Sequence, residues 1–125
     1  SQFETALTAS PEMIMTSNVI YKEINPTLPF TFSSQAIQFL KNALGQEILI
    51  ISDDLAQNSL LDKFSLKDTV SRPVEAGVDL LIFSGWDIGV EEGLKAYYQA
   101  FREGQISKEK VDSATKRIIK LKNQL

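Results

Sequence analysis

The sequence has neither cysteine nor histidine among its 125 residues. Without cysteine, a disulfide framework, a thiolate nucleophile and a zinc–cysteine site are excluded. Without histidine, a Ser-His-Asp triad and any imidazole acid or base are excluded within this chain. Catalysis here must rest on carboxylates, hydroxyls, lysine or tyrosine, or be completed by another polypeptide segment.

Long apolar runs and a charge excess are missing as well. No run reaches the roughly eighteen apolar residues of a membrane-spanning helix, and no basic-then-apolar leader is present, so the sequence predicts neither a membrane span nor a signal peptide. The formal net charge of −3 gives no reason to expect a nucleic-acid partner. No phosphate-binding glycine loop and no metal-ligand spacing is found, so neither a cofactor nor a metal is predicted.

The rest of the composition is that of one ordinary globular domain. Apolar residues make up 43% and charged residues 23% of the chain, which is enough apolar surface to offset chain entropy. We treat residues 1–125 as one unit. Because the first residue is Ser1 rather than methionine, we expect a chain cut from something longer.

Three short apolar runs predict buried parallel strands. They are Met13 to Met15, Ile48 to Ile51, and Val78 with Leu80 to Phe83. None of them alternates apolar with polar residues, so we expect both faces of each strand to be covered, as in parallel sheets flanked by helices.

Four segments have helical apolar spacing together with capping residues. They run from Ser33 or Ser34 to Gly45, from Ser65 to Ala76 with Gly77 as the stop, from about Val90 to Arg102, and onward from Ser107. Pro73 is expected to kink or break the last turn of the second helix. The stretch 25–32, which contains two prolines, is predicted to be a loop.

The last two helices are each expected to bury one face. In the third helix the buried residues are predicted to be Leu94, Tyr97 or Tyr98, and Phe101. In the fourth, the apolar face is predicted to consist of Val111, Ala114, Ile118, Leu121 and Leu125.

The element order β-α-β-α-β-α-α predicts an α/β protein with a parallel sheet. Three strands cannot close an eight-stranded barrel. The sequence therefore predicts either a small open sheet or a portion of a barrel whose other strands lie elsewhere.

The main candidate site follows the second apolar run. Asp53 and Asp54 lie at the carboxyl end of this strand, the end that faces the ligand crevice in parallel α/β folds. A carboxylate there can attack an anomeric carbon, bind a metal or accept a proton. Adjacent strand residues point opposite ways, so only one acid should face the site. Capping of the following segment explains the same residues equally well.

Polar residues also follow the other two runs. Thr16, Ser17 and Asn18 follow the first, where they could donate hydrogen bonds to ligand hydroxyls or simply form a polar turn. Ser84 and Trp86 follow the third; Trp86 could stack on a sugar ring or serve packing alone.

Four segments in series resemble family 3 glycoside hydrolases, in particular their β-N-acetylhexosaminidase branch. These are Met13–Tyr21 followed by Pro26, the nucleophile-like Ile50–Leu55, the strand entry Glu75–Leu81, and the closing helix from Gly104 to Lys122. The order and spacing match over nearly the whole chain. The resemblance implies that residues 1–125 are the C-terminal half of the catalytic (β/α)8-type barrel domain, present as a partial barrel.

The resemblance also implies roles for individual residues. By position, Asp53 is the nucleophile of a retaining mechanism, and Asp54 helps to orient the site. Ser17 and Asn18 are expected to bind sugar, although the position of Asn18 is often histidine in relatives. The implied substrates are terminal β-N-acetylglucosaminides such as peptidoglycan-derived sugars, in the cytoplasm or cell envelope of a bacterium.

The acid/base expected from the resemblance is absent from the chain. In this branch a His-Asp pair and a Lys-His stretch come from the N-terminal half of the barrel. We therefore expect the chain to be inactive alone and to pair with that missing half or with a second copy. Two other functions are compatible with parts of the sequence to different degrees. A non-catalytic α/β sugar-binding or self-associating module stays open, whereas a phosphorelay receiver is disfavoured because Asp79 begins its strand rather than ending it.

Overall fold

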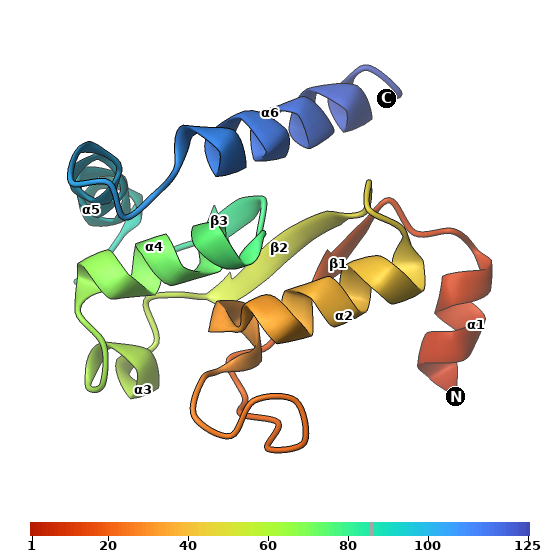
Figure 1. The fold of residues 1–125 in the computed structure, drawn as a ribbon, viewed down its shortest axis with the longest axis horizontal. Coiled ribbons are helices and arrows are strands. Elements are labelled where there is room, and N and C mark those ends of the chain that lie inside the picture. The colour runs from red at the N-terminus through yellow and green to blue at the C-terminus, as the bar shows by residue number, and fades with distance from the viewer. Residues whose placement is uncertain (86) are drawn as a thin grey trace.

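The computed structural model describes residues 1–85 and 87–125, and its strands form one parallel sheet (Figure 1). Strands β1 (Met13–Met15), β2 (Leu49–Asp54) and β3 (Leu80–Ile82) lie in the order β1-β2-β3. Both neighbouring pairs are parallel, with Ile14 opposite Ile50 and Ile51 opposite Leu80. Sequential parallel neighbours are the arrangement of β/α barrels, whereas doubly wound sheets reverse their strand order.

Helices connect and flank the strands. They are α1 (Gln2–Thr8), α2 (Ser34–Leu44), α3 (Asn58–Leu61), α4 (Leu66–Ala76), α5 (Val90–Arg102) and α6 (Lys108–Lys122), with a 3-10 turn, η1 (Phe30–Phe32), before α2. Figure 1 shows α2 and α4 side by side over the sheet and α6 crossing near β2. Within residues 1–85 and 87–125, no helix is long and apolar enough to cross a membrane.

Three of the four long helices begin at the predicted serine caps. The hydroxyls of Ser33, Ser65 and Ser107 each accept a hydrogen bond from a backbone N–H in the first turn of α2, α4 and α6. Gly77 ends α4 in the left-handed conformation, with φ of 109°, which glycine adopts without a Cβ clash. The short helices α1 and α3 and the turn η1 were not predicted.

Helix α4 ends at Ala76 as predicted, and of the two effects expected of Pro73, a kink or a break, the break does not occur. Proline lacks the N–H that would donate to the carbonyl of Thr69, so one helical hydrogen bond is lost. Both residues are buried, and Val70 and Val74 on the same helix belong to the core. Tertiary packing therefore maintains a helix that local preference disfavours.

Strand β2 is the centre of the core. Ile48 and Ile50 pack with Ile37 of α2 and with Val78 before β3. A second cluster joins α4 to α5, and a third joins Phe32, Leu55 and Leu60 near the carboxyl end of β2. Both acids belong to β2, which extends three residues beyond the predicted run.

The prediction that both faces of every strand are covered is wrong for β1. Met13 and Met15 are 45% and 59% exposed, while Leu49, opposite Met13 on β2, is buried. In the part of the chain that the structure describes, these two methionines are only partly covered, so one face of β1 carries exposed apolar side chains.

The predicted buried face of α5 is also only partly correct. Leu94, Tyr98 and Phe101 are exposed, and Tyr97 is half-buried. The residues that α5 buries are the small ones, Gly93, Ala96 and Ala100. On α6, Val111, Ala114, Ile118 and Leu121 are half-covered as the pattern predicts, whereas Leu125 is almost fully exposed.

Candidate functional site

The candidate site lies at the carboxyl edge of the sheet, where the segments after β1, β2 and β3 meet. The parallel registers align the ends of these strands, so polar residues that follow them in sequence become neighbours in space. Asn18 follows β1, Asp53 and Asp54 end β2, and Ser84 follows β3. Hydrogen bonds connect all three segments.

A β-bulge in β2 shapes this edge. Between Ile51 and Asp54 the strand advances three residues while β3 advances two, from Leu80 to Ile82. The hydroxyl of fully buried Ser52 accepts a hydrogen bond from the Ile82 N–H at 2.9 Å and replaces a lost ladder bond. Bulges redirect side chains beside functional sites, and this one directly precedes Asp53.

Asp53 points toward the segment that follows β1. Its Oδ2 accepts the backbone N–H of Asn18 at 3.2 Å, and its Oδ1 accepts the N–H of Asp54 at 2.8 Å and the side-chain amide of Gln57 at 3.4 Å. The residue is half-buried. Donors to both oxygens fix the carboxylate while part of it remains reachable from solvent.

Asp54 points toward the segment that follows β3. Its Oδ2 accepts the Ser84 hydroxyl at 2.6 Å, and its Oδ1 accepts the backbone N–H groups of Ser84 and Ala56, each at 3.0 Å. Burial raises the pKa of Asp54, but these hydrogen bonds together outweigh burial and hold the pKa below its usual value. Asp54 therefore stays ionised and joins the segments after β2 and β3.

Asn18 uses its side chain within the protein. Its Nδ2 donates to the carbonyl of Asp54 at 2.9 Å and to Oε1 of Gln57 at 3.3 Å. Its Oδ1 is buried without a partner among the described residues. Ser17 is half-buried, and its hydroxyl accepts the Val19 N–H at 3.4 Å.

The segment after β1 is held in place by two threonines. The hydroxyls of buried Thr16 and Thr31 lie 2.9 Å apart, and Thr31 also donates to the carbonyl of Ser17 at 2.9 Å. These bonds anchor the backbone just before Asn18 to the turn η1.

Sequence reasoning missed two residues of this site. Gln57 was overlooked because it lies four residues beyond Asp53 in an unassigned segment. Ser84 was noted only as a polar residue after β3, although its place beside the neighbouring strand end was a signal for contact with Asp54. Trp86, the possible stacking platform, lies outside the described residues.

No metal centre is formed by the part of the chain that the structure describes. The chain has no histidine or cysteine, and among its described aspartate and glutamate side chains no group of three or more could hold an ion. Asp53 and Asp54 diverge toward different neighbours instead of converging on one point.

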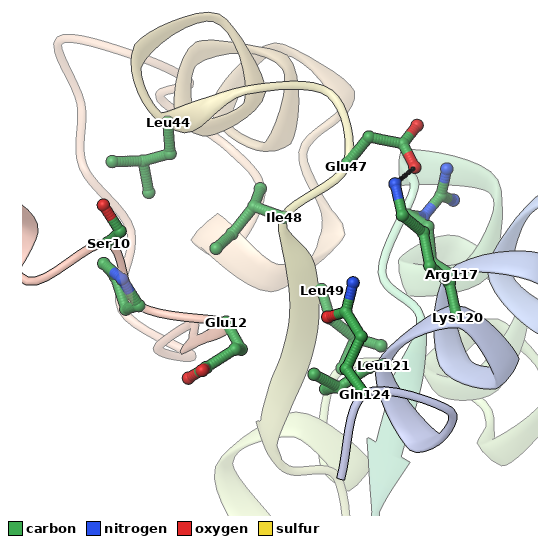
Figure 2. A pocket seen from close by; sticks show the side chains of 11 residues that line it. Ser10, Glu12, Leu44, Glu47, Ile48, Leu49, Arg117, Lys120, Leu121 and Gln124 are labelled. Atoms are coloured by element: carbon green, nitrogen blue, oxygen red, sulfur yellow. Dashed lines mark hydrogen bonds and ion pairs between the residues drawn. The ribbon is translucent and has the colours of Figure 1, made fainter.

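A separate pocket lies at the opposite edge of the sheet (Figure 2). It has a volume of about 270 Å³, and its lining includes Glu12, Leu49, Arg117 and Lys120. Lys120 and Glu47 form an ion pair there at 3.2 Å. Because these residues surround the amino ends of the strands, the pocket is distinct from the edge that carries Asp53.

Comparison with known proteins gives the chain its family. Residues 1–121 match the family model described as the glycosyl hydrolase family 3 N terminal domain. The chain belongs to this family. The matched residues include the strand with the Asp53–Asp54 pair and all of the closing helix α6 except Lys122.

Similar proteins agree with this assignment. A curated beta-hexosaminidase of Alkalilimnicola ehrlichii is 37% identical over 70 residues, which are 55% of this chain and 20% of that protein. A family 3 beta-N-acetylglucosaminidase structure from Paenibacillus sp. superposes with a TM-score of 0.85 at 29% identity, covering 97% of this chain and 23% of the other. A beta-N-acetylhexosaminidase from Beutenbergia cavernae gives a TM-score of 0.80 at 25% identity, covering 97% and 36%.

The family 3 chain thus spans about a fifth to a third of the length of these relatives. Its fold is α/β, with parallel β/α units that match a portion of the relatives' barrel-type domain.

Proposed function

We propose that this family 3 chain is the nucleophile-bearing, C-terminal half of the catalytic barrel of a retaining glycoside hydrolase that cleaves terminal β-N-acetylglucosaminides. The observation that carries the proposal is the carboxylate of Asp53, which lies at the carboxyl end of the central strand, is held by donors on both oxygens and stays partly open to solvent. Active sites of β/α barrels lie at this end of their strands.

The chemistry follows from a carboxylate held in a fixed position. Asp53 attacks the anomeric carbon, the glycosidic oxygen departs with a proton from a separate acid, and a covalent glycosyl-enzyme forms. Water then attacks the same carbon, giving up a proton to the same group, and the sugar leaves with its configuration retained. Asp54 keeps the strand end and the segment after β3 together during both steps.

The substrate class rests on the relatives. The matched proteins are a beta-hexosaminidase and a beta-N-acetylglucosaminidase, and beta-N-acetylhexosaminidase is the activity given to a third. Peptidoglycan-derived sugars are one natural source of such substrates. Ser17 and Asn18, on the same rim as Asp53, are proposed to contact the sugar.

The chain alone is proposed to be inactive. It has no histidine to serve as the acid/base, and a retaining mechanism needs both partners. The exposed Met13 and Met15 support pairing with the missing N-terminal half of the barrel, or with a second copy when that half is absent.

Replacement of Asp53 tests the proposal in the longer protein that contains this chain. Asp53→Ala should lower turnover of an aryl β-N-acetylglucosaminide by a factor of roughly 10⁴ or more, because the covalent step is lost. The matched control, Asp62→Asn, replaces an exposed carboxylate at the end of α3 and should leave the rate unchanged. Full activity of Asp53→Ala would rule out this nucleophile.

A second candidate is a non-catalytic α/β module that binds sugar or self-associates. Asn18 favours it, because this position is often histidine in enzymes of the branch. Titration of the longer protein with N-acetylglucosamine, beside the turnover assay, separates the two functions. Tight sugar binding without any hydrolysis would favour the second.

A further inference from the structure

The side chains of Asn18 and Gln57 form a closed hydrogen-bonded ring with Asp53. Gln57 Nε2 donates to Asp53 Oδ1 at 3.4 Å, and Gln57 Oε1 accepts from Asn18 Nδ2 at 3.3 Å. The backbone N–H of Asn18 completes the ring by donating to Asp53 Oδ2 at 3.2 Å. All three residues are half-buried, so solvent competes only weakly for these contacts.

The orientation of the Asn18 amide is fixed by its surroundings. Nδ2 faces two acceptors, the carbonyl of Asp54 at 2.9 Å and Gln57 Oε1. Rotation of the amide by half a turn would place an oxygen against both acceptors and lose two donated bonds. The protein instead leaves Asn18 Oδ1 buried without a partner, a costly arrangement that indicates how strongly the donor is required at this point.

The orientation of the Gln57 amide follows from that of Asn18. Its oxygen must face the Asn18 donor, which leaves its nitrogen facing Asp53. The backbone of Gln57 is itself anchored, because its carbonyl accepts the N–H groups of Leu60 and Leu61 at 3.0 and 3.2 Å at the start of α3. A side chain at position 57 therefore needs one donor and one acceptor in a fixed order.

We infer that Gln57 is a positioning residue for the Asp53 nucleophile and that Asn18 holds Gln57 in its working orientation. The inference deepens the proposed function and rests on it. Gln57 donates to Asp53 Oδ1 while the Asn18 N–H donates to Asp53 Oδ2, so the two donors together hold the carboxylate in a constant orientation. Fixed nucleophile geometry acts on the chemical step more than on binding.

Two substitutions at position 57 separate hydrogen bonding from packing. Gln57→Met keeps the approximate size of the side chain but removes both polar functions, and we expect kcat to fall roughly tenfold with KM within about twofold. Gln57→Glu keeps the shape but places a second carboxylate against Asp53 Oδ1. At neutral pH we expect kcat to fall at least about tenfold further, because like charges repel in a partly buried site.

The pH profile of Gln57→Glu gives the most specific readout. When the introduced carboxyl is protonated it again offers one donor and one acceptor, as the amide does. We therefore expect its rate relative to wild type to rise as the pH is lowered from 7 toward about 5, whereas the relative rate of Gln57→Met should stay flat. A packing role alone would give no such acid rescue.

Asn58→Asp is the matched control for added charge. It places a carboxylate on an exposed residue one position further along, in the first turn of α3, where acidic side chains are tolerated. We expect its rate to remain within about twofold of wild type across the same pH range.

The assay uses the longer protein and an aryl β-N-acetylglucosaminide with a good leaving group. An active wild type whose Gln57→Glu variant matches it at every pH would overturn the positioning role and leave the proposed function intact. An inactive wild type would instead contradict the proposed function.

A second measurement decides the inference independently of turnover. With glutamine side chains labelled with ¹⁵N, the NH₂ resonances of Gln57 should shift on Asp53→Ala and stay unchanged on Asp62→Asn. If the Gln57 NH₂ chemical shifts are the same in Asp53→Ala as in the wild type, the inference is overturned, whether or not the protein is active.

Discussion

At the end of β2, two adjacent carboxylates serve two different neighbours. Asp53 contacts the segment after β1, and Asp54 contacts Ser84 in the segment after β3. Adjacent side chains of a strand point in opposite directions, which separates the two carboxylates. The bulge at Ser52 changes the register just before them and so affects the direction of each. The paired acids therefore combine a candidate nucleophile with a residue that ties two segments together.

The hydrogen bonds to Asp54 predict a pH dependence of stability. Its pKa is lowered in the folded state, so the associated stabilisation is present above the ordinary pKa of 3.8 and is lost as the pH falls from there through the lower folded value. Ser84→Ala should bring the pKa of Asp54 back toward 3.8, because it removes the hydroxyl donor. Carboxyl-carbon NMR titration measures this change, and an unaltered titration would show that Ser84 does not stabilise the charge.

In the segment after β3, the position of Gly85 has no room for a larger side chain. A Cβ at this position would lie 2.8 Å from the Cβ of Ala56 and 2.8 Å from the carbonyl oxygen of Ile88, so the segments after β2 and β3 would have to separate. Gly85→Ala should destabilise the fold by about 1–3 kcal/mol in chemical denaturation. Gly89→Ala, whose Cβ would meet only ordinary contacts, is the control and should cost much less. Equal effects of the two substitutions would contradict the steric explanation.

Among the elements, the central strands and the long helices could be predicted from sequence because the signals were local. Continuous apolar runs marked the strands, and Ser33, Ser65 and Ser107 marked helix starts. The extent of α4 to Ala76 was predicted, but the effect of Pro73 on it was not, because it depends on the packing of Val70 and Val74 against distant residues.

The buried face predicted for α5 is only partly correct, for an identifiable reason. Large apolar residues formed a stripe at helical spacing, yet the helix packs through Gly93, Ala96 and Ala100, whose small side chains allow close approach to α4 and Phe83. Apolar periodicity defines a stripe but not what covers it. The contacts of Gln57 were beyond prediction in the same way, because they depend on how the chain turns after β2.

Helix α6 buries no residue fully, so its attachment depends on a few specific contacts. Arg117 donates through Nε and Nη2 to Asp79 Oδ1 at 2.9 and 2.8 Å, and the Asp79 side chain is fully buried. Asp79 Oδ2 also accepts the Ile50 N–H at 2.9 Å. The pair therefore links α6 to the amino end of the sheet.

Removal of Arg117 should loosen this link. Arg117→Met leaves the Asp79 carboxylate buried without its cation, and we expect a loss of about 3 kcal/mol in the free energy of unfolding. Lys120→Met, on the same helix, breaks only the exposed pair with Glu47 and should cost under about 1 kcal/mol. Similar losses for both variants in urea denaturation would contradict a special role for the buried pair.

The molecule as a whole is an α/β unit in which one face of the edge strand β1 is only partly covered. Its three parallel strands follow the order of a β/α barrel, and it covers 23% and 36% of the length of the two similar structures described above. The continuous apolar runs and the alternation of predicted strands and helices along the chain were enough to predict a parallel α/β fold. The exposure of Met13 and Met15 became evident only from the structure, because an apolar run does not show which of its side chains are covered by other elements.

Met15 distinguishes the isolated chain from the complete barrel. It is 59% exposed here, so Met15→Lys should reduce self-association of the 125-residue chain in analytical ultracentrifugation. In the longer protein, where we propose that this face is covered, the same change should destabilise by about 2–4 kcal/mol through an unpaired buried charge. Leu125→Lys, at a 98% exposed position, should do neither. An unchanged free energy of unfolding of the longer protein on Met15→Lys would contradict the proposal that Met15 is buried there.

Covalent trapping tests the central claim most directly. A fluorinated N-acetylglucosaminyl fluoride, whose ring fluorine slows the second step, should leave its sugar on the longer protein after incubation. Peptide mass spectrometry should then find the sugar on Asp53 and nowhere else, with configuration-retaining turnover of the ordinary substrate. A sugar attached to another residue, or rapid turnover with inversion and no labelled peptide, would contradict Asp53 as the nucleophile.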